Sequence, residues 1–223
     1  GSPYADTLYY YFGTYTWTPS PTGYMEDWNQ TIGRFSGWAA YVDFNYQITD
    51  TVDVSVGVRY NDDTKKFSQE ALTARNPSPV LGNRVQTGYT TSEGPLTDEQ
   101  SWSDTTYRVA VSFNPNENTL TYLSVTSGYK QGGFNSFALS PVAVWGITDA
   151  TPDTHEPGHF DAETSMSYEI GYKGTLFDGR MQLTGNAFMY KYEDLQANCN
   201  TTTPVATVCN VGKLDGYGTE GTA

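Results

Sequence analysis

The sequence is short of basic residues and of long apolar runs, and each shortage excludes a class of protein. Only 12 of the 223 residues are Lys or Arg, against 25 Asp and Glu, which gives a formal net charge of −13. A nucleic-acid-binding surface is normally basic, so no nucleic-acid partner is expected. No run approaches the roughly 18 consecutive apolar residues of a transmembrane helix, which excludes a helical membrane protein.

The chain instead contains long stretches in which apolar and polar residues alternate. The clearest is a pair of arms between Met166 and Tyr192, joined at Asp178-Gly179. An Asp-Gly pair between alternating runs predicts a tight β-hairpin, because both central positions of a type I′ turn need positive φ. Each arm reaches the nine to eleven residues of a membrane-spanning strand, with one apolar face for lipid and one polar face for a lumen.

Similar runs recur along the sequence and predict about eight antiparallel strands. The expected strands cover residues 6–17, 37–48, 52–60, 106–113, 119–129, the two arms already described, and a last strand that begins near Val208. Segments rich in Pro, Gly, Ser and Thr separate them. We expect long loops from about Asn61 to Ser103 and from Lys130 to about Thr164, where no period is sustained.

The connections between these strands fall into two classes that alternate. Short turns are expected near Asp50, Asn116 and Asp178, whereas longer loops lie near Pro19, Pro77, Pro141 and Thr202. Short turns on one rim and long loops on the other are typical of an outer-membrane β-barrel, with periplasmic turns and extracellular loops. The predicted fold is therefore all-β, an antiparallel transmembrane β-barrel segment.

Several motifs then resemble one known family in their order and spacing. Tyr122–Asn135 (YLSVTSGYKQGGFN) resembles the segment of TonB-dependent outer-membrane receptors in which a strand rises into a Gly-Tyr-Lys-x-Gly-Gly-Phe-Asn loop. The segments Tyr168–Lys173 (YEIGYK), Asp178–Arg180 (DGR) and Tyr190–Gln196 (YKYEDLQ) are similar to the family's next hairpin. Val211-Gly-Lys213 and Gly218-Thr-Glu220 look like the strand that follows it.

The resemblance implies a barrel of about 22 strands with a plugged lumen in the bacterial outer membrane. It also implies that the whole protein is not an enzyme and needs no cofactor. Such a receptor takes up a siderophore–iron complex or a similarly large, scarce nutrient, and contacts TonB through a plug domain. We expect the chain to be an internal piece of one barrel domain, surrounded by outer-membrane lipid, with the plug domain outside it.

Cys199 and Cys209 flank a short Thr/Pro-rich loop. In an oxidising extracellular or periplasmic compartment two such cysteines are expected to form a disulfide. The alternative is a pair of free thiols.

His155-Glu156-Pro157-Gly158-His159 matches the zinc-protease pattern H-E-x-x-H letter for letter. That chemistry needs a helix, so that both histidines share one face. Pro and Gly inside a helix cost about 3 and 1 kcal/mol, so neither catalysis nor a metal site is predicted. A solvated loop is the simplest interpretation, and the alternative is that His155 or His159 contacts a ligand or an adventitious metal ion.

Loop aromatics form the remaining candidate site, because binding residues concentrate on loops held by a rigid scaffold. These aromatics either contact the ligand, pack the loop against its neighbours, or belong to the interfacial aromatic belt. The candidates are Tyr129, Phe134, Phe137 and Trp145.

Two other functions remain open from the sequence. A passive porin shares the barrel pattern and differs from a receptor chiefly in lacking a plug. A secreted β-sandwich would explain the glycosylation-like Asn29-Gln-Thr31 and Asn200-Thr-Thr202, but not the strand lengths or the sorted loops.

Overall fold

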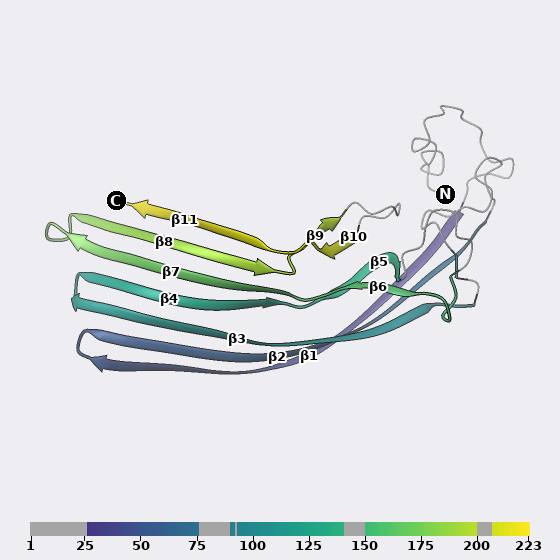
Figure 1. The fold of residues 1–223 in the computed structure, drawn as a ribbon, viewed down its shortest axis with the longest axis horizontal. Coiled ribbons are helices and arrows are strands. Elements are labelled where there is room, and N and C mark those ends of the chain that lie inside the picture. The colour runs from purple at the N-terminus through teal and green to yellow at the C-terminus, as the bar shows by residue number, and fades with distance from the viewer. Residues whose placement is uncertain (1–25, 76–89, 92, 141–149, 200–206) are drawn as a thin grey trace, which may run out of the picture.

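A computed structural model describes residues 26–75, 90–91, 93–140, 150–199 and 207–223 of the chain. These residues form antiparallel β-structure (Figure 1), as the alternating sequence predicts. No helix among them is long and apolar enough to cross a membrane. The strands are β1 (Glu26–Thr49), β2 (Val52–Arg75), β3 (Leu96–Asn116), β4 (Thr119–Lys130), β5 (Gly133–Ser140), β6 (Glu156–Phe160), β7 (Glu163–Leu176), β8 (Met181–Glu193), β9 (Gln196–Cys199), β10 (Thr207–Asn210) and β11 (Leu214–Thr222).

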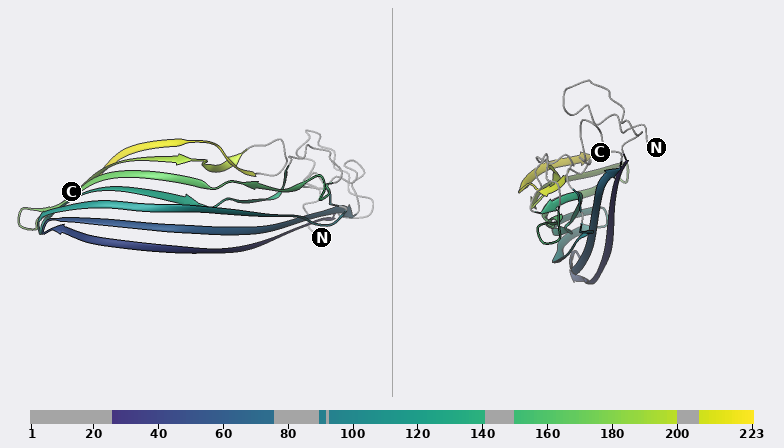
Figure 2. Two further views of the ribbon diagram at one scale, coloured as in Figure 1. Left: turned by 60° about the horizontal axis from the view of Figure 1, so that its bottom comes forward. Right: turned by 90° about the vertical axis from the view of Figure 1, so that its right-hand side faces the viewer.

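Seven of the strands form one continuous sheet in the order β1-β2-β3-β4-β7-β8-β11. Seen end-on, the sheet is curved rather than flat (Figure 2). The connections β1–β2, β3–β4 and β7–β8 are tight and lie together at one end of the sheet, as predicted. The short hairpins β5–β6 and β9–β10 lie toward the other end of the sheet, away from these turns (Figure 1).

The hairpin predicted at Asp178-Gly179 is confirmed, but its connection is longer than a two-residue type I′ turn and Phe177 also has a positive φ, of 54°. Leu176 pairs with Met181, and the four-residue connection between them has positive φ of 56° at Asp178 and 86° at Gly179. Such angles are easily reached by Gly and tolerated by Asp, which is why this pair ends one strand and starts the next.

The two faces of the sheet differ in chemistry along its central part. One face carries large apolar side chains that stay exposed, since no other part of the chain that the structure describes covers them. Members of this lipid-facing set on β1, β2, β3, β4 and β7 are Val42, Phe44, Tyr46, Val56, Val58, Val109, Val111, Leu123, Tyr168 and Ile170. In water such a surface would be strongly unfavourable, whereas hydrocarbon lipid is its natural solvent.

The opposite, lumen-facing side is polar and is connected by hydrogen bonds across strands. Arg108 in β3 forms an ion pair of 2.9 Å with Asp43 in β1 across the Gly57 position of β2. Ser55 donates a hydrogen bond of 2.5 Å to Asn45 on β1. The absence of a side chain at Gly57 leaves room for Asp43, whose carboxylate lies where a Cβ would stand.

Aromatic rings on the same face lie across glycines of the next strand. The Tyr122 ring of β4 covers Gly171 in β7, and its hydroxyl donates a hydrogen bond to Glu169. Tyr190 and Phe188 of β8 cover Gly216 and Gly218 of β11 in the same way. Glycine here provides the space that a neighbouring ring fills, which fixes the register of adjacent strands.

The long loop expected from Asn61 to Ser103 is wrong for much of its length. Strand β2 continues to Arg75 and β3 begins at Leu96, and the two stay in register from Asn61–Asp104 to Gln69–Leu96. Beyond the hydrocarbon layer neither face meets lipid, so the apolar alternation disappears while backbone pairing continues. Periodicity of hydrophobicity therefore marked the membrane-spanning part of each strand and not its end.

Three further expectations need correction or lie outside the described residues. The loop expected from Lys130 to Thr164 contains the hairpin β5–β6. The last wall strand begins at Leu214, because Val208 belongs to β10, which pairs with β9. The strand expected at residues 6–17 lies outside the residues that the structure describes.

Candidate functional site

The hairpin β5–β6 lies against the lumen-facing side of β2 and β3, beyond their membrane-spanning parts. Gln69 of β2 donates a hydrogen bond of 2.9 Å to the carbonyl oxygen of Ala138 in β5. Beneath the hairpin is a small hydrophobic core made of Ala71, Leu96, Leu139 and Ala150. The long connection between β4 and β7 is thus anchored to the inner wall, and it places side chains over the lumen.

The sequence Gly132-Gly133-Phe134-Asn135 explains how the chain enters this hairpin. A side chain at Gly132 would collide with the Trp102 indole and the Phe160 carbonyl, and one at Gly133 would meet the Phe160 ring. Two glycines therefore allow the backbone to pass close to β3 and β6. The Asn135 amide then exchanges two hydrogen bonds, of 2.6 and 2.9 Å, with the backbone of Val208 in β10.

Four rings meet where the hairpin contacts the wall, and we call them the aromatic cluster: Phe67, Trp102, Phe134 and His159. Phe134 is their centre. Its ring stacks on Phe67 with centroids 5.1 Å apart and an interplanar angle of 7°. Trp102 and His159 approach it edge-on at 6.4 and 6.2 Å. Such offset and edge-on pairs are favourable beyond the area that they bury.

Lys65 lies beside the aromatic cluster and connects the wall to the hairpin. Its ammonium group donates a hydrogen bond of 2.5 Å to the carbonyl oxygen of Gly132. The same group lies 5.6 Å from the Phe35 ring centroid and 5.7 Å from that of Trp102, within reach of cation–π attraction. Burial lowers the pKa of Lys65, and the nearby Asp63 carboxylate opposes that shift.

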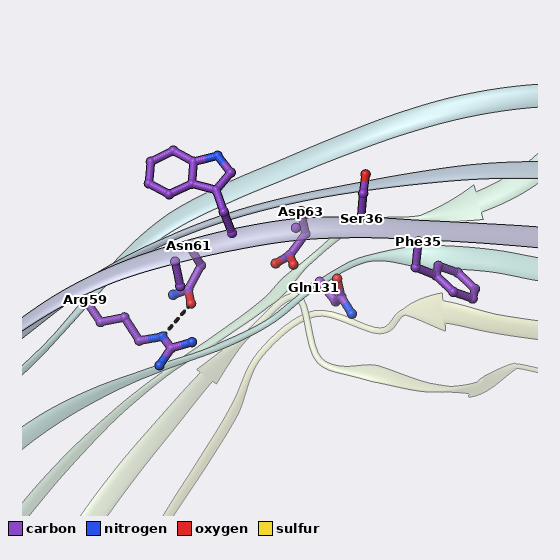
Figure 3. A pocket seen from close by; sticks show the side chains of 9 residues that line it. Phe35, Ser36, Arg59, Asn61, Asp63 and Gln131 are labelled. Carbon is purple, nitrogen blue, oxygen red and sulfur yellow. Dashed lines mark hydrogen bonds between the residues drawn. The ribbon is translucent and has the colours of Figure 1, made fainter.

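An open hollow of about 340 Å³ lies next to Lys65 along β1 and β2. Figure 3 shows Arg59, Asn61 and Asp63 on β2 facing it, with Gln131 of the following loop beside Asp63. Arg59 donates a hydrogen bond of 2.7 Å to Asn61, so its guanidinium keeps other donor groups free to bind an acceptor. The hollow thus offers a cation, an amide and a carboxylate at the mouth of the lumen.

Tyr129 lies at the same level, where β4 pairs with Thr164 near the start of β7. Its hydroxyl is buried and lies close to the Asp63 side chain, although no described residue completes a hydrogen bond of normal length with it. Burial, followed by the neighbouring Asp63 and Asp104 charges, raises the pKa of Tyr129 to about 12. An acceptor on a bound ligand would compete with Asp63 for this donor.

The residues predicted from the sequence are only partly brought together. Phe134 and His159 pair across the β5–β6 hairpin, and Tyr129 lies near Asp63. His155 is outside the aromatic cluster and shares a hydrogen bond of 2.9 Å with Thr154. The side chain of Phe137 and all of Trp145 lie outside the described residues. In the H-E-x-x-H segment, Glu156–Phe160 is strand β6 and His155 directly precedes it, so the two histidines do not share a helical face.

Sequence reasoning missed the wall residues Lys65, Phe67 and Trp102, because it assigned them to a loop. A usable signal was present. Lys65 and Phe67 continue the odd-numbered, lumen-facing parity of Arg59, and Trp102 continues the even-numbered parity of Arg108. Extending each strand by its parity, rather than by hydrophobicity, would have placed them on the inner wall.

The hairpin β9–β10 supports the site from the other side. A disulfide joins Cys199 and Cys209, as predicted, with their Cα atoms 6.0 Å apart. Gln196 of β9 donates hydrogen bonds of 3.0 Å to the carbonyl oxygens of Gln131 and Asp161, which flank the hairpin β5–β6. The disulfide therefore lies in the same network that holds β5–β6 against the wall.

Comparison with known protein families gives one match that covers the whole chain. The model of the TonB-dependent receptor-like β-barrel matches residues 1–223. Among curated proteins, the chain is 28% identical over 182 residues to the pesticin receptor of Yersinia pestis. It is 27% identical over 130 residues to a TonB-dependent siderophore receptor, PiuA, of Acinetobacter baumannii.

These alignments cover most of the chain but a small share of its relatives. The match to the pesticin receptor takes in 82% of this chain and 22% of that protein, and the match to PiuA takes in 57% and 16%. Among solved structures, the ferric yersiniabactin uptake receptor FyuA of Yersinia pestis superposes with a TM-score of 0.61 at 22% identity. That superposition covers 90% of this chain and 26% of FyuA, and it supports the barrel fold.

Proposed function

The chain belongs to the TonB-dependent receptor family as part of its β-barrel, and we propose that the whole protein takes up a siderophore–iron complex or a similarly large, scarce nutrient. Proteins of this family lie in the bacterial outer membrane, and they are transporters rather than enzymes. The curated relatives are named as receptors for pesticin and for a siderophore, which supports a ligand too large for passive pores.

The observation that supports this proposal best is the hairpin β5–β6 anchored over the lumen. A general pore needs a wide, polar channel, whereas a receptor needs fixed side chains that recognise one ligand. Phe134 is held between Phe67 and His159 by ring contacts, and Lys65 fixes the start of the hairpin through Gly132. Aromatic side chains that are already ordered lose little entropy when a ligand binds.

We assign ligand contact first to Phe134, Trp102 and Tyr129, at the extracellular mouth of the lumen. Their rings and the Tyr129 hydroxyl suit a ligand with planar groups and hydrogen-bond acceptors. The proposed binding set also includes the loop residues that the sequence singled out, which are Phe137, Trp145, His155 and His159.

The remaining machinery is proposed to lie in the rest of the protein. The chain spans about a quarter or less of the relatives that it matches. We assign residues 1–223 to a single barrel domain of about 22 strands, and energy coupling to a plug domain that contacts TonB. The polar wall around Arg108 and Asp43 is the surface that such a plug would face.

Ligand binding by the full-length receptor in detergent tests the proposal. A panel of ferric siderophores, with and without aromatic groups, is titrated while tryptophan fluorescence is recorded. We expect one of them to bind, and Phe134→Ala to weaken that binding by about tenfold or more, the loss of one well-packed aromatic contact. Phe177→Ala serves as the matched control, because Phe177 is 71% exposed in the turn at the opposite end.

Two results would contradict the proposal. Equal siderophore affinity in wild type and in the Phe134→Ala variant would show that Phe134 of the hairpin β5–β6 does not contact the ligand. Failure of every siderophore in the panel to bind, with the barrel correctly folded, would remove the siderophore assignment.

A further inference from the structure

Three metal-ligating side chains converge where the hairpin β5–β6 meets the barrel wall. Asp98 is on β3, and Glu156 and His159 are on β6, about 60 residues further along the chain. One ligand atom from each of the three lies within 4.8 Å of the other two. The three are the only such group among the described residues, with Asp98 half-buried and Glu156 exposed.

The spacing between His159 and Asp98 is the first reason to consider a metal. The Nδ1 atom of His159 lies 3.8 Å from Oδ2 of Asp98. This is too long for a hydrogen bond between the two groups. Two ligand atoms that share a tetrahedral zinc ion, each about 2.1 Å from it, lie roughly 3.4 Å apart. A side-chain shift of about half an ångström would therefore bring both atoms to coordinating positions.

The orientation of these side chains is already fixed by neighbours outside the group. Oδ1 of Asp98 accepts a hydrogen bond of 2.7 Å from the Glu99 amide, and Oδ2 accepts one of 2.9 Å from the Gln100 side chain. The His159 ring is held edge-on against Phe134. Outer contacts of this kind orient metal ligands and strengthen their binding. Asp98 and His159 have side-chain exposures of 15% and 31%, so an ion would be partly screened from water.

Glu156 stands three residues before His159 on the same strand. Residues three apart on a regular strand point to opposite faces. The pairing of β5 with β6 is irregular here, because β5 advances from Phe134 to Leu139 while β6 moves only from His159 to Pro157. In this hairpin a carboxylate oxygen of Glu156 lies within 4.8 Å of the ligand atoms of Asp98 and His159.

We propose that Asp98, Glu156 and His159 form a binding site for a divalent transition-metal ion of the Zn²⁺ class. One imidazole and two carboxylates are a donor set that zinc accepts, with further positions left for water. The ion would join β6 to β3 and so clamp the hairpin β5–β6 to the wall. It is not the H-E-x-x-H protease arrangement, because His155 is absent from the group and no helix is present. His159 belongs both to this site and to the proposed ligand-binding set, so the zinc site is tested without any nutrient ligand.

The test compares two histidines that are four residues apart in the full-length receptor. Zn²⁺ is titrated into the purified, metal-stripped protein in competition with a fluorescent chelator. We expect His159→Gln and Asp98→Asn each to weaken one binding event by at least about tenfold, the scale seen when the surroundings of a metal ligand are altered. His155→Gln is the matched control for the metal alone, and it should leave this zinc-binding event unchanged because His155 is outside the group.

Amide exchange is a second measurement, and it distinguishes a zinc ion that joins two strands from ions bound only at the surface. If Zn²⁺ joins β6 to β3, it should slow amide exchange across β5 and β6 in wild type and in His155→Gln, but not in His159→Gln. Equal zinc binding by both histidine variants would overturn the proposal and indicate adventitious surface ligands. So would the absence of competitive binding in wild type, or unchanged exchange on adding Zn²⁺.

Discussion

The ammonium group of Lys65 in β2 donates a hydrogen bond of 2.5 Å to the carbonyl oxygen of Gly132, 67 positions later in the chain. This contact joins the extended end of a barrel strand to the first residue before the hairpin β5–β6. Next to it, Lys66 points to the other face and forms an ion pair of 2.7 Å with Glu99. The two consecutive lysines thus have different partners, because the side chains of successive strand residues face opposite sides of the sheet.

Replacement of Lys65 by Met should loosen the hairpin without unfolding the barrel. Met keeps most of the alkyl chain and removes the donor, and a hydrogen bond from a charged group contributes about 1.5–3 kcal/mol at most. We expect amide exchange in β5 and β6 to accelerate by about tenfold, the factor that corresponds to 1.4 kcal/mol. Lys66→Met is the control, since its ion pair is largely exposed. Identical exchange in the two variants would show that Lys65 does not anchor the hairpin.

The ring of Tyr122 lies over Gly171, which predicts that alanine destabilises the protein at this glycine but not at Gly185 of the same sheet. Gly171→Ala would place a methyl group against that ring and displace its hydroxyl from Glu169, at a cost of about 1–3 kcal/mol for overpacking. Gly185→Ala should be tolerated, because the nearest atom lies 3.7 Å from the added carbon. Stability is measured by urea-dependent folding of the receptor into bilayers.

A double variant checks the cause of that cost. With Tyr122→Ala already present, adding Gly171→Ala should have little further effect, since the colliding ring is gone. An undiminished cost in the double variant would assign the effect to the backbone of β7 instead.

The two faces of β2 should respond differently to the same charged side chain. Val56→Arg puts a guanidinium into lipid near the midplane and should cost about 2–4 kcal/mol. Ser55→Arg places it on the polar face, where Asn45 and Asp43 are close, and should cost less. Folding of both variants into bilayers measures the difference. Equal costs would mean that the apolar face does not meet lipid.

Removal of the disulfide should destabilise the hairpins β9–β10 and β5–β6, which hold the candidate site, more than it destabilises the barrel strands. The bridge closes a ring across 10 positions, for which chain entropy predicts a contribution of about 2–3 kcal/mol at most. In the Cys199→Ser, Cys209→Ser variant we expect faster amide exchange in β9, β10 and β5, with an unchanged barrel. Intact mass before and after reduction and alkylation verifies the bridge in wild type. Free thiols in protein taken directly from the membrane would contradict it.

Much of the fold could be predicted because lipid imposes a simple pattern. Val54, Val56 and Val58 alternate with polar residues since one side must be apolar for the length of the hydrocarbon layer. The Asp178-Gly179 turn and the Cys199–Cys209 bridge were also predictable, because each depends on local sequence. Where β2 leaves the membrane at about Asn61, that pattern stops, although the strand continues to Arg75.

The candidate site was only partly predictable for a related physical reason. Phe134 and His159 stand in a segment whose motif was recognisable, but their partners Phe67 and Trp102 are far away in the sequence. Only the folding of β5–β6 onto the wall brings them together, and a single sequence carries no periodic signal for that contact. The approach of Asp98 to His159 is hidden in the same way.

The central claim is that this chain is part of a TonB-dependent receptor for a siderophore–iron complex. Its most direct test is a measurement of iron uptake in cells, with and without the energy source of the transporter. The full-length gene is expressed in a bacterium without its own receptors, and uptake of radioactive iron bound to the siderophore found in the binding panel is followed over time. We expect saturable uptake that stops when TonB is deleted or the proton-motive force is collapsed. Uptake that continues undiminished under both conditions would identify a passive pore and contradict the account.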